Sequence, residues 1–388
     1  MRSNRFFSVL LLALAPFSPA RASTSLHEQL TALYPDLTPQ ELQAKLDSTS
    51  DGFHFLRTFV PYYYAQVAQG PATLLPLRNA LGSHGGWCVG DAHLENFGAV
   101  LDRRSHAIFT MNDLDDAGPC PLYADTLRFL TGALLNSTGT DLAPLLAAYR
   151  SGLQGESVPF SSEVQALLAA SETGGTTLPV HKLDGSAHLK RAAGDTETDA
   201  QEKQELQDTF NATFGSGTQL LDSFKTRKAG GGSGGLLRIE TLFSRAGGPL
   251  QGFEFKQMVQ PGCFPLTTSP IPPLQERVAR SISIEQGVDA SPKYQTVQWG
   301  TPNLGFLIRP LWVGNQGIKL SDYPPTRIEG IARDEMRVLG SLHRKSMDPD
   351  YLAAVLATPD SSWTAAATEL ADAMNQAFRE ISQEPAQP

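Results

Sequence analysis

Apolar and polar residues repeat with helical spacing in some stretches of this chain and with strand spacing in others. Residues 23–50 are expected to be helical, because Ser25 and the run Thr38-Pro39-Gln40-Glu41 are typical helix starts. The aromatic run that follows, residues 51–69, is expected to lie in the core, with Arg57 as a cation inside it. Further helices are predicted over residues 123–135, 140–170, 274–286, 327–345 and 363–381, and a polar helix is predicted to end near Phe214.

Strands are predicted where short apolar or alternating runs lie between turn signals. Trp87 to Val89 forms one such run, and residues 97–101 and 107–111 read as a hairpin. Residues 237–241 and 253–255 predict a second pair of strands, and residues 305–311 predict a buried strand. The mixture of helices and strands predicts an α+β fold.

The first 22 residues have the layout of a secretory signal peptide. Arg2 and Arg5 precede an apolar run, and Ala20-Arg21-Ala22 is a typical cleavage pattern. We expect cleavage after Ala22 and export to the periplasm or the extracellular space; an uncleaved anchor is the less favoured alternative. No later stretch reaches the roughly 18 consecutive apolar residues of a membrane span, so no integral membrane segment is expected after cleavage.

Charge and cysteine content narrow the functional classes. The net charge is −9, and it becomes −12 once the three arginines of residues 1–22 are removed. A protein this acidic is a poor candidate for sequence-independent nucleic-acid binding, so nucleic acid is not an expected partner. Of the three cysteines, Cys88 and Cys120 flank an acidic region; a disulfide between them and two lone buried thiols are both compatible with the sequence.

Residues 87–129 hold an unusual density of polar and acidic side chains between apolar runs. Its members are Asp91, His93, Glu95, Asn96, Asp113, Asp115, Asp116 and Asp125. Carboxylates at this density repel one another unless a positive charge lies among them, and a divalent cation that prefers oxygen ligands is the usual solution. Solvated acids on two turns are the alternative, but the order and spacing of the residues favour a metal site.

Asp91, Asn96 and Asp113 have the order required for phosphoryl transfer. That reaction needs a carboxylate near the acceptor hydroxyl and oxygen ligands for the metal that bridges the phosphates. Asp91 and Asn96 lie five positions apart on a loop after a buried strand, as in the catalytic loop of protein kinases. Asp113 follows the hairpin and is placed to meet the metal, with Asp115 as a further candidate ligand.

The run GDAHLENFGAVLD, followed by MNDLDDAG and LYADTLRF, resembles the catalytic half of aminoglycoside-phosphotransferase-type kinases. The resemblance implies that Asp91 is the catalytic base and that Asn96 and Asp113 hold Mg. It also implies that Asp125 is a structural acid that braces the catalytic loop.

The same motifs are also similar to the bacterial domain-of-unknown-function 2252 family. The segments FHFLR, GGGSGG, FEFKQ, FLIRPL and LGSLHRKS add to this similarity, which extends over most of the chain after residue 22. The similarity to this family implies a kinase-like fold.

A second group of residues suits a nucleotide. It comprises Gly230, Gly231, Gly232, Ser233, Gly234 and Gly235, with Lys256 on a following strand. Glycines let backbone amides approach phosphates, and a strand lysine can neutralise their charge. Glu276 or Glu285 on the next helix would hold that lysine, and Glu276 is taken as the first candidate. A flexible linker is the alternative, but the glycines lead directly into a strand.

The order of the two groups predicts a circular permutation, because a kinase has its glycine loop and lysine before its catalytic loop. We therefore predict a two-lobed, protein-kinase-like α+β fold with the catalytic half first. The expected parts are a signal peptide (1–22), a helical segment (23–86), the catalytic and metal-binding part (87–214), a small β lobe with the glycine loop (215–312) and C-terminal helices (313–388).

Four other side chains have two interpretations each. His93 is more consistent with bracing the loop than with binding a metal, because the paired-histidine motifs of metallophosphoesterases are missing. Arg309 on its apolar strand is a candidate ion-pair partner for an acid. His343 and Arg344 are expected either to cap a helix or to contact phosphate, with the cap favoured.

The function expected from these residues is Mg- or Mn-dependent transfer of a phosphoryl or related group from ATP or another nucleotide to an unknown small-molecule or protein acceptor. Because nucleotides are scarce outside the cytoplasm, two alternatives stay open. One is a nucleotide- or metal-binding pseudokinase-like module, and the other is a metal-dependent phosphoester hydrolase.

Overall fold

The computed structural model describes residues 25–113, 115–137, 140–185, 188–228, 230–245, 248–267, 269–287, 295–300 and 304–383. Its α-helices are α1 (Leu26–Leu33), α2 (Pro39–Asp47), α3 (Gly52–Thr58), α4 (Val60–Gln69), α5 (Leu75–Leu81), α6 (Leu122–Asn136), α7 (Ala143–Gln154), α8 (Ser162–Gly174), α9 (Ala200–Phe214), α10 (Leu274–Gln286), α11 (Pro325–Arg344), α12 (Tyr351–Ala357) and α13 (Asp360–Gln383). Short 3₁₀ helices are η1 (Ala72–Leu74), η2 (Val180–Lys182) and η4 (Leu320–Asp322).

The strands form three antiparallel sheets. They are β1 (Gly85–Cys88), β2 (Phe97–Leu101), β3 (Ala107–Met111), β4 (Gly118–Pro121), β5 (Thr196–Glu197), β6 (Thr218–Arg227), β7 (Leu237–Arg245), β8 (Gln251–Gln257), β9 (Gln295–Trp299), β10 (Leu304–Pro310) and β11 (Gln316–Gly317). The largest sheet has the order β5-β6-β7-β8-β10-β9, and the smaller sheets are β1-β4 and β11-β2-β3. The predicted α+β class is confirmed.

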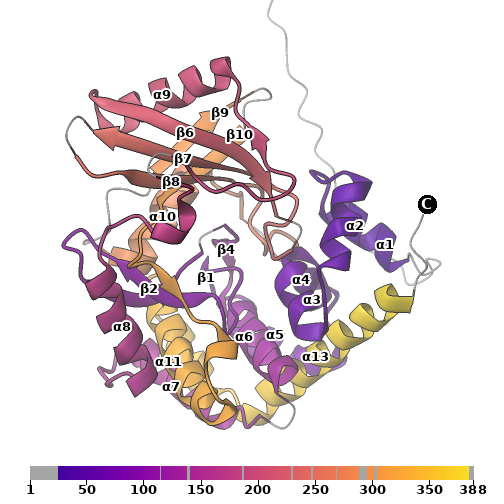
Figure 1. Cartoon of the computed structure of the whole chain (residues 1–388). Helices are drawn as coiled ribbons and strands as arrows, with labels where there is room; N and C mark the ends of the chain where they lie inside the picture. Colours follow the sequence, from indigo (N-terminus) through magenta and orange to yellow (C-terminus); the bar gives the residue numbers. More distant parts are fainter. Residues whose placement is uncertain are drawn as a thin grey trace, which may run out of the picture.

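The two faces of the six-stranded sheet differ in character. Its outer face is covered by α9, which lies across the strands at the top of Figure 1. The side chains between them form one apolar cluster: Leu206, Phe210, Ile239, Phe243, Phe253, Phe255, Trp299, Phe306 and Ile308. Because successive strand residues point to opposite faces, the residues between these apolar ones point inward. The inner face therefore presents Arg238, Glu240, Glu254, Lys256 and Arg309.

The rest of the chain forms a helical body below this sheet, and the two small sheets lie between them (Figure 1). Helix α11 packs against α7, and the long helix α13 packs against α6 and α3. A second apolar core fills this body, with Trp87, Phe97, Phe129 and Trp363 fully buried among its members. The inner sheet face is thus the side that turns toward the helical body.

Local signals in the sequence predicted most of these elements. Ser25 and Thr38 cap α1 and α2 through reciprocal capping boxes with Glu28 and Glu41. The hairpin β2–β3 and helix α10 have the predicted bounds. Strands β4, β5, β6, β9 and β11 and helices α3, α4, α5 and α12 were not predicted. In β6, a register shift between Leu220 and Asp222 breaks the two-residue alternation that identifies a strand.

Two other predictions concern the ends and the thiols of the chain. The proposed signal peptide lies outside the described residues. Within the described ranges, no helix has the length and apolar character that crossing a membrane requires.

Cys88, Cys120 and Cys263 are all buried and unpaired, so the structure has lone thiols in place of a Cys88–Cys120 disulfide.

Candidate functional site

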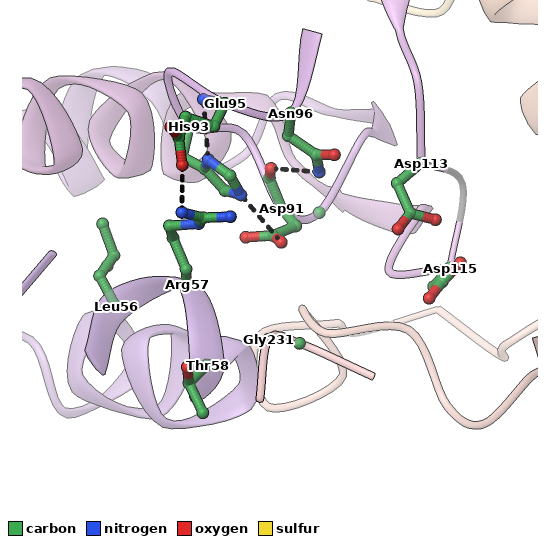
Figure 2. A network of polar contacts seen from close by, with 12 residues as sticks. Leu56, Arg57, Thr58, Asp91, His93, Glu95, Asn96, Asp113, Asp115 and Gly231 are labelled. Atoms are coloured by element: carbon green, nitrogen blue, oxygen red, sulfur yellow. Dashed lines mark hydrogen bonds and ion pairs between the residues drawn. The ribbon is translucent and has the colours of Figure 1, made fainter. Parts of the chain in front are cut away.

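A cavity of about 960 Å³ separates the inner sheet face from the helical body. Its body side is lined by the loop after β1 and by the turn after β3, and its sheet side by the glycine loop and by β7 and β10. The predicted residues that line it are Asp91, Asn96, Asp113, Asp115, Gly230, Gly231, Gly232 and Ser233. Figure 2 shows Asp91, Asn96, Asp113 and Asp115 together on the body side, with Gly231 facing them. Two motifs that are far apart in sequence therefore meet at one cavity.

Asp91 is held in position by a buried arginine. Arg128 of α6 donates to Asp91 Oδ1 from both Nε (3.2 Å) and Nη2 (2.5 Å). Burial disfavours the Asp91 carboxylate, but the adjacent His93 imidazole and the Arg128 guanidinium, both in hydrogen-bond contact with it, outweigh burial and hold the pKa of Asp91 well below the ordinary value. The Asn96 side-chain amide donates to the Asp91 backbone carbonyl at 2.9 Å, which closes the loop between the two residues. Asp91 is thus an ionised carboxylate on a rigid loop.

His93 braces this loop, as expected. Its Nδ1 accepts from the Glu95 backbone N–H at 3.1 Å, so Nε2 carries the proton and faces Asp91 Oδ2 at 3.3 Å (Figure 2). Burial lowers the pKa of His93, which favours this neutral form. Both ring nitrogens are therefore engaged by the loop, which leaves neither for a metal.

Asp125 has the bracing role that the family resemblance implied. Its carboxylate is fully buried in α6 and accepts hydrogen bonds from the backbone amides of Val89 (2.6 Å) and Gly90 (3.1 Å). It also accepts from the Tyr64 hydroxyl at 2.6 Å and contacts His343 Nε2 at 3.1 Å. His343 is therefore a buried structural contact that ties α11 to the loop after β1, and it does not line the cavity.

Three acids are crowded around one lysine at the turn after β3. Lys256 Nζ lies 2.8 and 2.6 Å from the two carboxylate oxygens of Asp113 and also forms an ion pair with Asp115. Desolvation raises the pKa of Asp115 well above its ordinary value, and the charge of Asp113 adds to this effect. Desolvation and the charges of Asp91 and Asp113 likewise raise the pKa of Asp116 to about 7. One ammonium group does not neutralise this cluster.

The donor set at this turn partly fits a hard divalent cation. Asp115 Oδ1 is buried without a hydrogen-bond partner among the described residues, and the Asn96 amide oxygen lies on the side of Asp113 in Figure 2. Carboxylate and amide oxygens are the ligands that Mg²⁺ prefers. In the described part of the chain, however, no three His, Cys, Asp or Glu side chains converge on a metal position. Lys256 supplies the positive charge between Asp113 and Asp115 in this arrangement.

The glycine loop is held by a lysine that the sequence analysis missed. Lys45 of α2 is fully buried, and its ammonium donates to the carbonyls of Gly231 (2.7 Å), Gly232 (2.6 Å) and, at 3.4 Å, Gly234. Burial lowers the pKa of Lys45 to about 7. Its position three residues after Leu42, on the buried face of α2, was the available signal.

The carbonyls of this loop are thus occupied, while several of its amides are not. Gly234 N–H donates to Gly231 O and Gly235 N–H to Lys228 O, which closes the turn. The amides of Gly231, Gly232 and Ser233 donate to no protein acceptor in the ranges that the structure covers. Gly231 has φ +80°, a conformation that favours glycine. Gly234 and Gly235 belong to the loop but do not line the cavity.

Lys256 does not have the predicted helix glutamate as its partner. Glu276 is exposed in the first turn of α10, and Glu285 at the other end of that helix is buried with Oε1 unpaired among the described residues. Desolvation raises the pKa of Glu285, and the charge of Asp113 raises it further. Among the residues described, the ion-pair partners of Lys256 are Asp113 and Asp115, so the prediction of Glu276 as partner is wrong. Asp113 approaches because the turn after β3 lies directly against β8.

Arginines form the rest of the sheet wall. Glu254 on β8 accepts from Arg238 Nη1 on β7 and from Arg309 Nε on β10, both at 2.6 Å. The prediction of Arg309 as an ion-pair partner is confirmed, and its Nη1 also lies 3.9 Å from Asp113. Arg238 was missed, although its register opposite Lys256 follows from strand alternation once the two strands are paired.

The fold and the cavity together define a mixed α+β protein with a polar site between an antiparallel sheet and a helical body. Residues 37–144 match the family described as "Uncharacterized protein conserved in bacteria (DUF2252)", which confirms the resemblance to that family over this segment. The matched segment carries Lys45, Asp91, Asn96 and Asp113 and ends before the glycine loop. No curated protein and no solved structure matches the chain.

Proposed function

We propose that this protein is a kinase-like phosphotransferase that moves a phosphoryl or related nucleotide-derived group to an acceptor, with Mg or Mn. The observation that carries the proposal is the contact between Lys256 and Asp113, 143 positions apart, since Asp113 lines the same cavity as Asp91 and Asn96. Under this proposal the fold is a permuted kinase-like fold, with the catalytic half before the sheet that holds the phosphates. The export inferred from residues 1–22 belongs to the same proposal.

The residues of the cavity then take the following roles. Asp91, ionised and exposed to the cavity, accepts the proton of the acceptor hydroxyl. Arg128 and Asn96 fix the carboxylate and the loop, so that the base is held in one geometry. Asn96, Asp113 and Asp115 would hold the divalent cation, which neutralises phosphate charge when bound. The unoccupied amides of Gly231 to Ser233 and the sheet wall suit the phosphates.

A pseudokinase-like binding module is the second candidate, and one observation favours it. Arg128 engages Asp91 Oδ1 with two donors, and this pairing lowers the basicity of the carboxylate. A base with a strongly lowered pKa is a weak proton acceptor. The same cavity would then bind a nucleotide without transferring a group.

One experiment separates the two candidates. The purified chain is incubated with nucleotides labelled at the γ or the α phosphate, with Mg or Mn, and both thermal stabilisation and protein labelling are measured. We expect stabilisation and labelling in the wild type, and a fall in labelling of about 10²- to 10⁴-fold in Asp91→Asn with binding retained. Asp372→Asn, exposed on α13, is the matched control.

The outcomes are distinct. Binding without labelling, in the wild type as in Asp91→Asn, would identify the pseudokinase-like module. A wild-type protein that no nucleotide stabilises or labels would refute both candidates.

A further inference from the structure

Four cationic side chains gather on the sheet side of the cavity. They are Lys182 of η2, Lys228 at the end of β6, Arg238 of β7 and Arg309 of β10. They come from four different segments, and strand alternation directs Arg238 and Arg309 to the inner face of the sheet. The sheet side of the cavity, called the cationic wall below, therefore carries four positive charges. From the sequence, Lys256 was the one cation expected to hold phosphate.

The acids of this wall do not balance its cations. Lys182 forms an ion pair with Glu240 at 2.7 Å, and the single carboxylate of Glu254 is shared by Arg238 and Arg309, the second of which also lies 3.9 Å from Asp113 on the body side. Lys228 has no ion-pair partner in the part of the chain that the structure describes. Desolvation by the surrounding segments lowers the pKa of Lys228, although its side chain stays accessible to solvent, and the neighbouring charge of Arg238 lowers it further. An unbalanced cationic wall inside a cavity attracts an anion.

Glu254 also organises the two guanidinium groups. It fixes one nitrogen of each arginine at 2.6 Å, so both are oriented before any ligand arrives. Arg238 uses Nη2 to hold the Ser233 hydroxyl at 2.6 Å, which joins the wall to the glycine loop. The unoccupied amides of Gly231 to Ser233 therefore lie in the segment that Arg238 anchors. Guanidinium groups and backbone amides together are the usual donors to phosphate oxygens.

Lys256 differs from Lys228 and Arg238 of this wall because two carboxylates already pair with it. Its ammonium is already engaged by Asp113 and Asp115, so it has little capacity left for a phosphate in this arrangement. The cations that can attract a phosphate are therefore those of the wall, Lys228, Arg238 and Arg309.

We propose that Lys228, Arg238, Arg309 and the Gly231–Ser233 amides form a binding subsite for a multiply charged phosphate group, distinct from the Lys256 contact. The phosphate chain of a nucleotide and a free inorganic polyphosphate share this chemistry. The assignment to a nucleotide rests on the proposed function, but the subsite itself does not. It would hold the distal part of a phosphate chain whose other end reaches Asp113, because Arg309 lies between the two positions.

The test is calorimetric titration of the full chain with inorganic tripolyphosphate at low salt and without a divalent metal. We expect binding to the wild type that weakens about tenfold in Lys228→Met and in Arg238→Met. Lys203→Met, exposed on α9 over the opposite face of the sheet, removes the same charge and is expected to leave the affinity unchanged. Lys228 is exposed, so its variant tests the subsite even where Arg238→Met, which leaves Glu254 with one partner, weakens the fold.

Parallel titrations with ATP and with adenosine distinguish the sources of the phosphate. In one outcome, tripolyphosphate binds the wild type but not Lys228→Met or Arg238→Met, and no nucleotide binds. That outcome would support the subsite and refute the phosphotransferase proposal. Binding of adenosine but not of tripolyphosphate would overturn the subsite. So would tripolyphosphate affinities in Lys228→Met and Arg238→Met that equal that of Lys203→Met.

Discussion

Two groups of acids in residues 87–129 have opposite environments. Asp125 lies in the body with all its oxygens satisfied, by two backbone amides, a tyrosine hydroxyl and a histidine. Asp113, Asp115 and Asp116 lie at the cavity, where Asp113 and Asp115 form ion pairs with the same lysine, and Asp115 Oδ1 has no hydrogen-bond partner among the described residues. The family resemblance already implied a structural role for Asp125, and the surroundings of the four acids show the physical difference between them.

The number of hydrogen-bond donors around each acid indicates whether that acid stabilises the fold or is a candidate to bind a ligand. A buried carboxylate with a full set of donors stabilises its surroundings. In the crowded set the pKa values of Asp115 and Asp116 are raised, which costs stability, and such costs concentrate at functional sites. The turn after β3 is therefore the place where a bound cation would relieve the protein.

The largest effect on stability is expected from removing Asp125, the acid whose oxygens all have hydrogen-bond partners. Asp125→Ala leaves the Val89 and Gly90 amides, the Tyr64 hydroxyl and His343 without their acceptor, so we expect a loss of about 3–5 kcal/mol in the free energy of unfolding. Urea unfolding measures it, with exposed Asp372→Ala as the control. A loss below about 1 kcal/mol would show that Asp125 does not brace the loop.

The second prediction concerns Asp116, one of the crowded acids, and the dependence of stability on pH. The pKa of Asp116 is about 7 in the folded protein, above its ordinary value of 3.8, so the folded state keeps a proton that the unfolded chain releases. Stability should therefore be highest below pH 4 for this group and decline as the pH rises to 7. A shift of about 3 pKa units corresponds to roughly 4 kcal/mol across the window, and Asp116→Asn should remove that decline.

Unfolding curves at several pH values between 4 and 7 provide the measurement. The difference between wild type and variant isolates Asp116 from the other titrating acids. Parallel pH profiles for the two proteins would contradict the crowding of Asp116.

The smallest expected effect concerns the rejected helix glutamate. Because Glu276 is exposed on α10, Glu276→Gln should change the free energy of unfolding by less than about 0.5 kcal/mol. It should also leave the tripolyphosphate affinity unchanged. A loss of affinity equal to that of Lys228→Met would return Glu276 to the site.

Local chemistry made much of the fold predictable, while tertiary packing decided the rest. Capping residues such as Ser25 and Thr38 act within one turn, so the starts of α1 and α2 followed from the sequence. The hairpin β2–β3 followed from its period. Strand β6 did not, because the irregularity at Leu220 interrupts its alternation.

The site divides in the same way. The spacing of Asp91 and Asn96 is local, and the loop that joins them is closed by a hydrogen bond between them. Lys45 and Arg238 depend on which distant segments pack together, and the sequence carries only weak signals for that. The choice of Glu276 failed for the same reason, since the face that a helix turns to its neighbours is a property of the whole fold.

The contact between Lys45 and the glycine loop has a consequence for how the chain folds. The lysine and Gly231 are 186 positions apart, so α2 must wait for most of the chain before its buried ammonium finds an acceptor. Contacts of such long range form late, because closing the intervening loop costs conformational entropy. A growing or truncated chain that stops before Gly231 has an unmatched charge in its first helices. The packing of α2 and the formation of the glycine loop are therefore coupled in the folding of this chain.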